Sequence, residues 1–199
     1  MIEIFKRLRW DWRDEIGRFN LLNAIWMRTP GTLGFVWRNR HVPRRFLAAG
    51  GGIVIHEGVR YRGVHKIRCG DRVEIGVGCF LQASGGLRLG DDVILGPGVK
   101  IWTVNHRFGD LRKPISGQGY DYEPVSIGRG CWLGADVFVM PGVDLPEGCV
   151  VAARSVVAKK AYPPFSILAG YPARVVGRRD VPETAAQAEV KSLMEAVGA

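Results

Sequence analysis

Aliphatic residues recur at every sixth position along much of the chain. From residue 127 the sequence reads IGRGCW LGADVF VMPGVD LPEGCV VAARSV VAKKAY, and each block of six opens with isoleucine, leucine or valine. The fifth position of a block is small or β-branched, as at Cys131, Val137 and Ala161. This period fits neither the 3.6-residue turn of an α-helix nor the two-residue alternation of a long strand. It indicates a short strand followed by a corner, repeated many times.

The same register occurs upstream, in CGDRVE IGVGCF LQASGG and in LGDDVI LGPGVK IWTVNH, and a weaker coil begins near Ile55. Three blocks make one coil of about 18 residues, and stacked coils pair as parallel strands roughly 4.8 Å apart. The leading aliphatic residues then face inward in three columns. These columns are Cys69, Leu89, Ile127 and Leu145; Ile75, Leu95, Leu133 and Val151; and Leu81, Ile101, Val139 and Val157. The sequence therefore predicts an all-β solenoid.

Both ends of the chain lack this register. Apolar residues at steps of three and four predict an amphipathic helix within residues 1–20; they are Phe5, Leu8, Trp12, Ile16 and Phe19. Residues 21–50 are expected to form an irregular cap or loop, because Thr29-Pro30-Gly31 interrupts them. A second helix is expected over residues 183–197. Helical ends would cap the solenoid, whose terminal coils expose apolar faces and strand edges.

These patterns divide the chain into an N-terminal helical and irregular cap (1–50), a solenoid domain (51–179) with one large loop (105–126), and a C-terminal helix (180–199). The length of 199 residues suits one sizeable core. The sequence holds no long apolar run of the kind that crosses a membrane, and its start lacks the features of a secretory signal. A cytoplasmic protein is therefore the default expectation.

Positive charge is concentrated near the N-terminus. The formal net charge is +9, and residues 1–50 hold ten Lys and Arg against four Asp and Glu, together with four of the six Trp. Basic and aromatic residues together suit a nucleic acid or an anionic membrane surface, whereas the plainer interpretation is a solvated face around a small helical cap. No nucleic-acid recognition motif accompanies the charge, so nucleic-acid binding is not expected.

The four cysteines follow the repeat. They form no C-x-x-C pair and no metal-ligand spacing. Cys69 leads a block, and Cys79, Cys131 and Cys149 occupy fifth positions, so all four fall where side chains face inward. We expect small buried apolar side chains rather than disulfides or a metal site.

One large insertion interrupts the solenoid, NHRFGDLRKPISGQGYDYEPVS at residues 105–126. A regular coil accommodates such an excursion only at a corner, and loops held on a rigid scaffold concentrate binding and catalysis. The insertion opens with Asn105 and His106, and His106 is the only histidine within the clear six-residue register. The other three (His41, His56 and His65) precede that register and are interpreted as structural or exposed.

The pattern resembles the hexapeptide-repeat acyltransferases, in particular the maltose and galactoside O-acetyltransferases, the xenobiotic acetyltransferases and the O-acetyltransferases of bacterial surface polysaccharides. The resemblance covers roughly residues 51–179. It rests on the six-residue blocks, on Asn105-His106 at the head of a loop, on PVSIG at 124–128 and CWLG at 131–134, and on PPFSILAGYPAR at 163–174. It implies a left-handed parallel β-helix, against the usual right-handed crossover rule.

The resemblance also implies chemistry. The family transfers an acetyl group from acetyl-CoA, and a histidine at the head of this loop acts as general base, a position that His106 occupies. An alcohol is a poor nucleophile at neutral pH and needs such a base. Asn105 is expected to orient the imidazole or contact the acceptor, although an asparagine at a corner also suits left-handed backbone geometry. Candidate sugar contacts are Asp121, Tyr122 and Glu123 in the loop and Gln82 and Ser84 one coil earlier, where many members carry Asn or Asp.

For coenzyme A, the family uses a groove between neighbouring prisms that is lined by small corner residues and basic side chains. Ala135 and Ala153 match two such corners. Trp132 matches a family tryptophan that either lines the groove or packs in the core or at an interface. Lys159 and Arg174 match basic positions, and cations of this kind hold phosphates. A second family arginine falls at Gly177 in this chain, with Arg178 beside it as the substitute.

Family members are trimers with active sites between subunits, so we expect a homotrimer. The favoured function is acetyl-CoA-dependent O-acetylation of a sugar hydroxyl, in a bacterial surface polysaccharide or its precursor, with the basic N-terminal 50 residues contacting the inner membrane. Alternatives are transfer to an amine or small molecule, and a non-catalytic scaffold or membrane adaptor. A zinc hydratase of the γ-carbonic anhydrase type needs three converging histidines, so no metal is expected.

Overall fold

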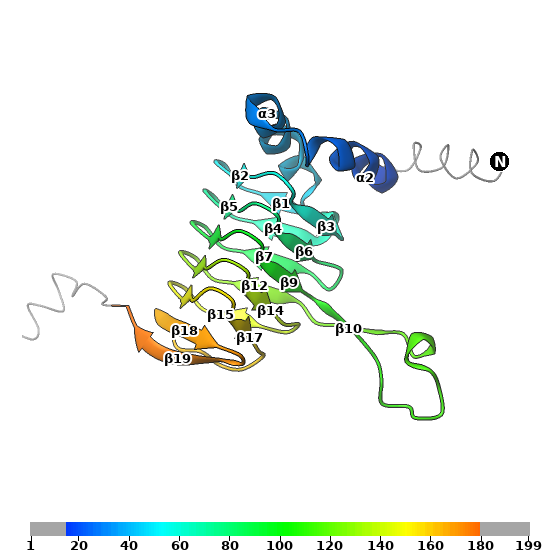
Figure 1. The fold of residues 1–199 in the computed structure, drawn as a ribbon, viewed down its shortest axis with the longest axis vertical. Coiled ribbons are helices and arrows are strands. Elements are labelled where there is room, and N and C mark those ends of the chain that lie inside the picture. The colour runs from blue at the N-terminus through cyan, green and yellow to red at the C-terminus, as the bar shows by residue number, and fades with distance from the viewer. Residues whose placement is uncertain (1–14, 180–199) are drawn as a thin grey trace, which may run out of the picture.

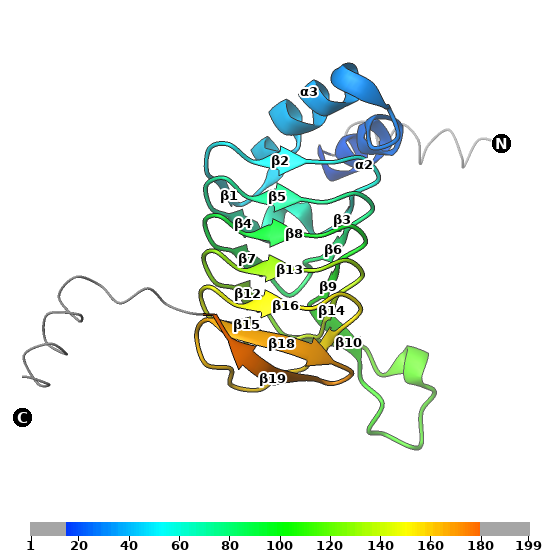
Figure 2. The same cartoon turned by 60° about the vertical axis from the view of Figure 1, so that its left-hand side comes forward.

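The computed structural model describes residues 15–179 and shows a parallel β-helix with three flat faces (Figures 1 and 2). Face A contains β1 (Ala48–Ala49), β4 (Ile67–Cys69), β7 (Leu87–Leu89), β12 (Val125–Ile127) and β15 (Asp144–Leu145). Face B contains β2 (Val54–Ile55), β5 (Glu74–Ile75), β8 (Ile94–Leu95), β13 (Trp132–Leu133), β16 (Val150–Val151), β18 (Ser166–Gly170) and β19 (Ala173–Arg178). Face C contains β3 (Arg60–Arg62), β6 (Phe80–Gln82), β9 (Lys100–Trp102), β14 (Phe138–Val139) and β17 (Val156–Val157). The predicted solenoid is confirmed.

The coils wind in the left-handed sense that the family resemblance implies. In Figure 2 the chain runs from left to right along the nearer strands of face B and returns behind them as it descends. Strands of successive coils pair in parallel on every face, and β19 alone among the described strands of face B runs antiparallel to its neighbour, β18. This antiparallel pair covers the strand edge at the C-terminal end of the solenoid.

The three inward columns form as the six-residue spacing predicts. Ile127 pairs with Leu89 and Leu145, Leu133 with Leu95 and Val151, and Val139 with Ile101 and Val157. These leading residues are almost completely buried and belong to one continuous core. Ile55 pairs with Ile75, so the weaker first coil is real. Its first strand, β1, pairs with β4, which places the start of the solenoid a few residues before position 51.

All four cysteines are free and buried, as predicted from the repeat. Burial raises the pKa of the Cys69 thiol to about 12 and does the same for Cys79 because a thiolate is poorly solvated in an apolar interior. The Cys131 thiol donates to the Pro146 carbonyl at 3.0 Å. These side chains therefore act as small core residues.

The N-terminal cap differs from the expectation for residues 21–50. Two helices, α2 (Glu15–Trp26) and α3 (Gly31–His41), are followed by the short 3-10 helix η1 (Pro43–Arg45). The expectation of irregular structure was wrong for most of this segment. Pro30 is the N-cap of α3, so the Thr29-Pro30-Gly31 breaker separates two helices instead of starting a loop. Most of the helix predicted within residues 1–20, and the one predicted at 183–197, lie outside the described residues.

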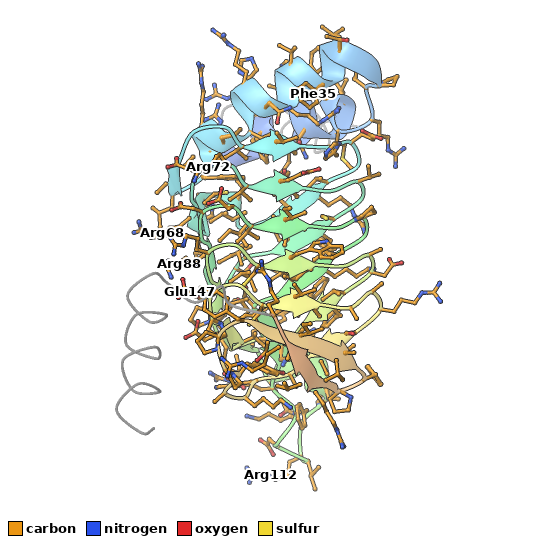
Figure 3. All side chains as sticks on the ribbon, turned by 90° about the vertical axis from the view of Figure 1, so that its left-hand side faces the viewer. Phe35, Arg68, Arg72, Arg88, Arg112 and Glu147 are labelled. Atoms are coloured by element: carbon orange, nitrogen blue, oxygen red, sulfur yellow. The ribbon has the colours of Figure 1, made fainter. Side chains whose placement is uncertain are left out.

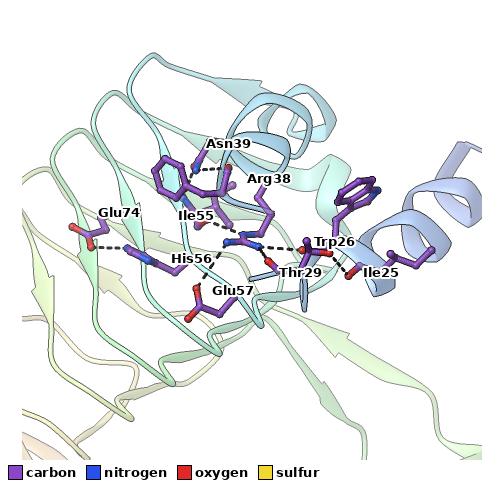
Figure 4. Close-up of polar contacts among 10 residues, drawn as sticks. Ile25, Trp26, Thr29, Arg38, Asn39, Ile55, His56, Glu57 and Glu74 are labelled. Atoms are coloured by element: carbon purple, nitrogen blue, oxygen red, sulfur yellow. Dashed lines mark hydrogen bonds and ion pairs between the residues drawn. The ribbon is translucent and has the colours of Figure 1, made fainter. Parts of the chain in front are cut away.

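Arg38 of α3 attaches this cap to the solenoid (Figure 4). Its side chain is buried, and it donates hydrogen bonds to the carbonyls of Trp26, Thr29 and Ile55 at 3.1, 2.9 and 3.3 Å. One guanidinium thus joins the end of α2, the linker and β2, because its several donors can serve several acceptors at once.

Among residues 15–179, no helix combines the length and apolar character needed to cross a bilayer.

The loop predicted at 105–126 leaves the solenoid at the corner between faces C and A, where an excursion was expected. It forms a two-stranded antiparallel arm from β10 (Val104–His106) and β11 (Tyr120–Tyr122), with a 3-10 turn, η3 (Ile115–Gly117), near its tip. The arm projects away from the prism in both views (Figures 1 and 2). His106 therefore lies on a paired strand rather than in an irregular loop.

Candidate active site

The base of the arm is held by a buried threonine. Thr103 donates its hydroxyl proton to the Gln82 carbonyl at 2.7 Å, and the same hydroxyl oxygen accepts the backbone N–H of Gly85 at 2.8 Å. The backbone N–H of Glu123, on the returning strand, donates to the Thr103 carbonyl at 3.0 Å. Thr103 therefore fixes one end of the arm to the preceding coil and holds the returning end beside it, which fixes the point from which His106 projects.

The imidazole of His106 is exposed and packs against one aromatic ring. The ring centroids of His106 and Tyr120 are 4.5 Å apart, with 43° between the ring planes, and the two residues are direct partners in the β10–β11 register. Within the described part of the chain, no side chain hydrogen-bonds to the imidazole. Its nitrogens are thus available to a substrate, and an imidazole can both accept and return a proton near neutral pH.

Asn105 precedes His106 in the sequence, but the two side chains point to opposite sides of β10. Successive side chains of a strand point to opposite sides, and Asn105 pairs with Asp121 on β11. Its backbone is not in the left-handed region, in contrast to corner residues such as Asp136 and Arg154. Left-handed geometry therefore does not explain this asparagine, and no hydrogen bond joins it to the imidazole within residues 15–179.

Several candidate sugar contacts already have partners within the chain. Asp121 accepts a hydrogen bond from the Arg107 guanidinium at 2.6 Å, and Glu123 forms an ion pair with Lys159. The side-chain oxygen of Gln82 accepts the Ser84 backbone N–H at 3.0 Å. Tyr122 is exposed and, with Ser84, lines a cavity of about 800 Å³ beneath α2. Asp121 and Glu123 line other surface cavities, on the arm and at the corner beside Lys159, so Tyr122 and Ser84 are the two candidates that share a single cavity.

The coenzyme candidates occupy two different corners and a face. Ala135 follows β13 and Ala153 follows β16, so both lie at the corner between faces B and C. Lys159 follows β17 and lies at the corner between faces C and A, where the arm begins. Trp132 is 52% exposed on face B, between Ile94 and Val150. A single chain therefore does not bring all of these residues to His106.

The two arginines lie at opposite ends of β19. Arg174 pairs with Ala169, near Gly170, whose backbone N–H donates to the Ser155 hydroxyl at the corner between faces B and C. Arg178 pairs with Ser166 and donates to the Pro164 carbonyl at 3.4 Å, at the corner between faces A and B. Arg174 thus shares a corner with Ala153, whereas Arg178 does not.

Tyr120 and Thr103 were not singled out from the sequence. A signal for Tyr120 does exist, because the alternation Tyr120-Asp121-Tyr122 directly before the solenoid resumes is typical of a strand and could pair with Val104-Asn105-His106. Thr103 gives no such signal, since its role depends on contacts with the preceding coil. Among the described residues, no three His, Cys, Asp or Glu side chains are placed to hold a metal ion.

Comparisons with known proteins agree with this architecture. A family model described as the hexapeptide repeat of succinyl-transferase matches residues 124–159. An Escherichia coli protein named as a colanic acid biosynthesis acetyltransferase is 32% identical over 130 residues, which are 65% of this chain and 68% of that protein. A Mycobacterium tuberculosis protein named as an acetyltransferase is 33% identical over 132 residues, 66% of this chain. The match spans 44% of the mycobacterial protein, so this chain corresponds to less than half of its length.

A solved structure is also similar in fold. The crystal structure of a maltose O-acetyltransferase from Clostridium difficile superposes with a TM-score of 0.74 at 24% identity, covering 85% of this chain and 91% of that one. At this level of identity the likeness concerns the fold.

Proposed function

Because this chain belongs to the hexapeptide-repeat acetyltransferase family, we propose that it transfers an acetyl group from acetyl-CoA to a sugar hydroxyl, with His106 as general base. The observation that carries the proposal is the exposed imidazole of His106, held against Tyr120 on an arm fixed by Thr103. A base of this kind must be positioned but free to meet the proton it abstracts.

In the proposed step, one imidazole nitrogen of His106 accepts the proton of the sugar hydroxyl. The oxygen attacks the thioester carbonyl carbon and forms a tetrahedral intermediate that carries the negative charge on the former carbonyl oxygen. The intermediate collapses, the carbon–sulfur bond breaks, and the coenzyme thiolate takes the proton from the imidazolium. The products are the acetyl ester and free coenzyme A, and the imidazole returns to its starting state.

The coenzyme groove in this proposal is formed by two chains. Ala135, Ala153 and Arg174 lie along one edge of face C, and His106 and Lys159 along the other edge. A neighbouring subunit would bring the first edge to the second, as a cyclic trimer does. The small alanines leave room for the pantetheine arm, and the arginine supplies charge for the phosphates. Lys159 would add to that charge after exchanging its ion pair with Glu123 for a phosphate. Trp132 and Arg178 lie farther along face B and are assigned outer contacts.

The acceptor in this proposal is a surface polysaccharide or its precursor at the cytoplasmic side of the inner membrane. The cap carries exposed apolar side chains, including Leu33, Phe35 and Val36 of α3, and exposed arginines at positions 28, 40 and 44. Phe35 lies at the end of the molecule that the cap forms (Figure 3). Apolar and basic residues on one surface favour an anionic bilayer.

Vesicle sedimentation tests this contact. The protein should be enriched on vesicles of phosphatidylglycerol and phosphatidylcholine over phosphatidylcholine alone. Leu33→Ser with Phe35→Ser should reduce the enrichment, and Ile94→Ser on face B, an equally apolar but remote change, should leave it intact. Equal sedimentation with both vesicle types would remove the membrane contact and leave the catalytic proposal standing.

The catalytic proposal is tested by release of coenzyme A and by mass spectrometry of products from a panel of glycans. Wild-type protein should release the thiol only when an acceptor is present, with a matching mass increase in one glycan. If neither acetyl-CoA binding nor any product is detected over a panel of neutral, acidic and amino sugars, the non-catalytic scaffold becomes the better account.

A further inference from the structure

The cavity beneath α2 adjoins the candidate active site. Its walls are α2, the segment from β3 through the 3-10 helix η2 (Val64–Lys66), and Tyr122 of the arm. Its volume is about 800 Å³, which is ample for a sugar with a substituent. Ser84 contributes from the next coil, so the cavity opens at the corner from which the arm departs.

The charges that line this cavity are all positive. Arg60, Arg62 and Lys66 lie along its floor with His65, and no aspartate or glutamate is among its lining residues. The Arg60 guanidinium lies 4.7 Å from the centre of the Phe80 ring, and the Lys66 ammonium donates to the Ser84 carbonyl at 2.8 Å. Neither contact neutralises the charge. Arg62 is exposed and has no ion-pair partner within residues 15–179.

Such a cavity favours an oxyanion. A concave surface lined by charge of one sign concentrates the electrostatic field and attracts the opposite charge. Arginine presents several donors in a planar fork that matches phosphate and carboxylate. The asparagines of α2 that line the opposite wall, Asn20 and Asn23, provide uncharged amide groups suited to sugar hydroxyls.

The cavity connects to His106 through two tyrosines. The ring centroids of Tyr122 and Tyr120 are 6.2 Å apart, and Tyr120 packs against His106. Arg62 is aligned with Gln82 and then with Trp102, the last residue of the strand before the arm. Arg62 therefore lies two strand spacings from the level of the arm, or about 10 Å along the solenoid axis.

We propose that the acceptor is an anionic glycan whose phosphate or carboxylate group binds Arg62, Arg60 and Lys66, while a nearby hydroxyl reaches His106. This inference rests on the proposed acetyl transfer and adds the chemical class of its acceptor. Because Arg62 lies about 10 Å from the level of the arm, the anionic group and the hydroxyl that is acetylated belong to different parts of the glycan.

Direct binding of small sugars tests the anion site without relying on catalysis. Calorimetric titrations with glucose, glucose 1-phosphate, glucuronic acid and inorganic phosphate separate the contributions of ring, phosphate and carboxylate. At least one charged sugar should bind about tenfold more tightly than glucose, and Arg62→Gln should abolish this difference, as expected for a lost charge-assisted hydrogen bond. The matched control is Arg88→Gln, because Arg88 is an exposed arginine on face A (Figure 3).

The same variants in the thiol-release assay separate the two proposals. Arg62→Gln should raise the KM for charged acceptors about tenfold and leave the KM for acetyl-CoA unchanged. Transfer that depends on His106 but is indifferent to acceptor charge and to Arg62→Gln would overturn the anionic acceptor and preserve the acetyltransferase. If charged sugars bind the wild-type protein but not Arg62→Gln, and no acetyl transfer is detected, the anion site is preserved and the acetyltransferase is overturned. Equal or undetectable binding of all four probes would overturn the anion site.

Discussion

The imidazole of His106 packs against the phenol ring of Tyr120 across the two strands of the arm, with the ring centroids 4.5 Å apart and the ring planes tilted by 43°. This contact is the only ring contact of His106 within the described residues, so Tyr120 is a positioning residue in the proposed reaction. Tyr120→Phe keeps the ring and should retain near wild-type kcat. Tyr120→Ala removes it and should lower kcat about tenfold, since a misplaced base transfers its proton poorly.

The KM for acetyl-CoA distinguishes positioning from general damage in these variants. Tyr120 does not belong to the proposed coenzyme groove, so Tyr120→Ala should leave that KM unchanged while kcat falls. A parallel rise in the KM for acetyl-CoA, or an equal loss in Tyr120→Phe, would argue against a role in placing the imidazole.

The proposed sharing of the active site between the chains of a trimer predicts complementation. His106→Ala removes the base, and Ala153→Trp fills the corner assigned to the coenzyme, so each homotrimer should be inactive. In randomly mixed trimers, about one quarter of the sites combine an intact His106 from one chain with an intact Ala153 from its neighbour. Co-expression should therefore restore about one quarter of wild-type activity. Activity that stays at the level of the separate variants would place both residues in one chain's site, or in none.

The repeat gives a direct stability prediction. Leu133 is fully buried between Leu95 and Val151, so Leu133→Ala should lower the free energy of unfolding by about 2–5 kcal/mol. Ile94, one residue before Leu95 on the outer side of face B, is 42% exposed, and Ile94→Ala should cost less than about 1 kcal/mol. Urea unfolding of both variants measures the difference, and equal losses would contradict the assignment of inner and outer positions.

The buried thiols predict alkaline sensitivity. Burial raises the pKa of Cys69 and Cys79 to about 12, so the folded state keeps these thiols protonated where the unfolded chain releases their protons. The contribution of these two thiols to stability should consequently be constant below about pH 8.5 and fall as the pH rises above it. Unfolding of Cys79→Ala should show a shallower fall between pH 9 and 11. An unchanged slope would show that this thiol does not contribute to the alkaline sensitivity.

The solenoid was predictable because its rule is local. A residue such as Leu133 faces inward by virtue of its place in a block of six, and the pairing of Ile127 with Leu89 follows from the same count across an insertion. The cap was less predictable, because α3 turns Leu33 and Val36 to the surface instead of showing one buried apolar stripe. Its attachment depends on Arg38, whose three backbone acceptors come from separate segments.

The site was predictable only in part. His106 and the start of the arm could be located from the interruption of the repeat, and the two groups of coenzyme candidates could be placed on corners. Spacing alone did not show that the two groups lie on opposite edges of face C, because that requires each strand to be assigned to its face in every coil. The ion pair of Glu123 with Lys159 and the basic cavity under α2 depend on contacts between residues distant in sequence, which spacing alone does not reveal.

The most direct test of the central claim is the acetyl-transfer rate of His106→Ala with acetyl-CoA and an accepted glycan. If His106 is the general base, kcat should fall by about 10²–10⁴-fold, while the KM for acetyl-CoA and the unfolding transition stay close to wild type. A His106→Ala protein that acetylates the glycan at the wild-type rate would contradict the proposed mechanism.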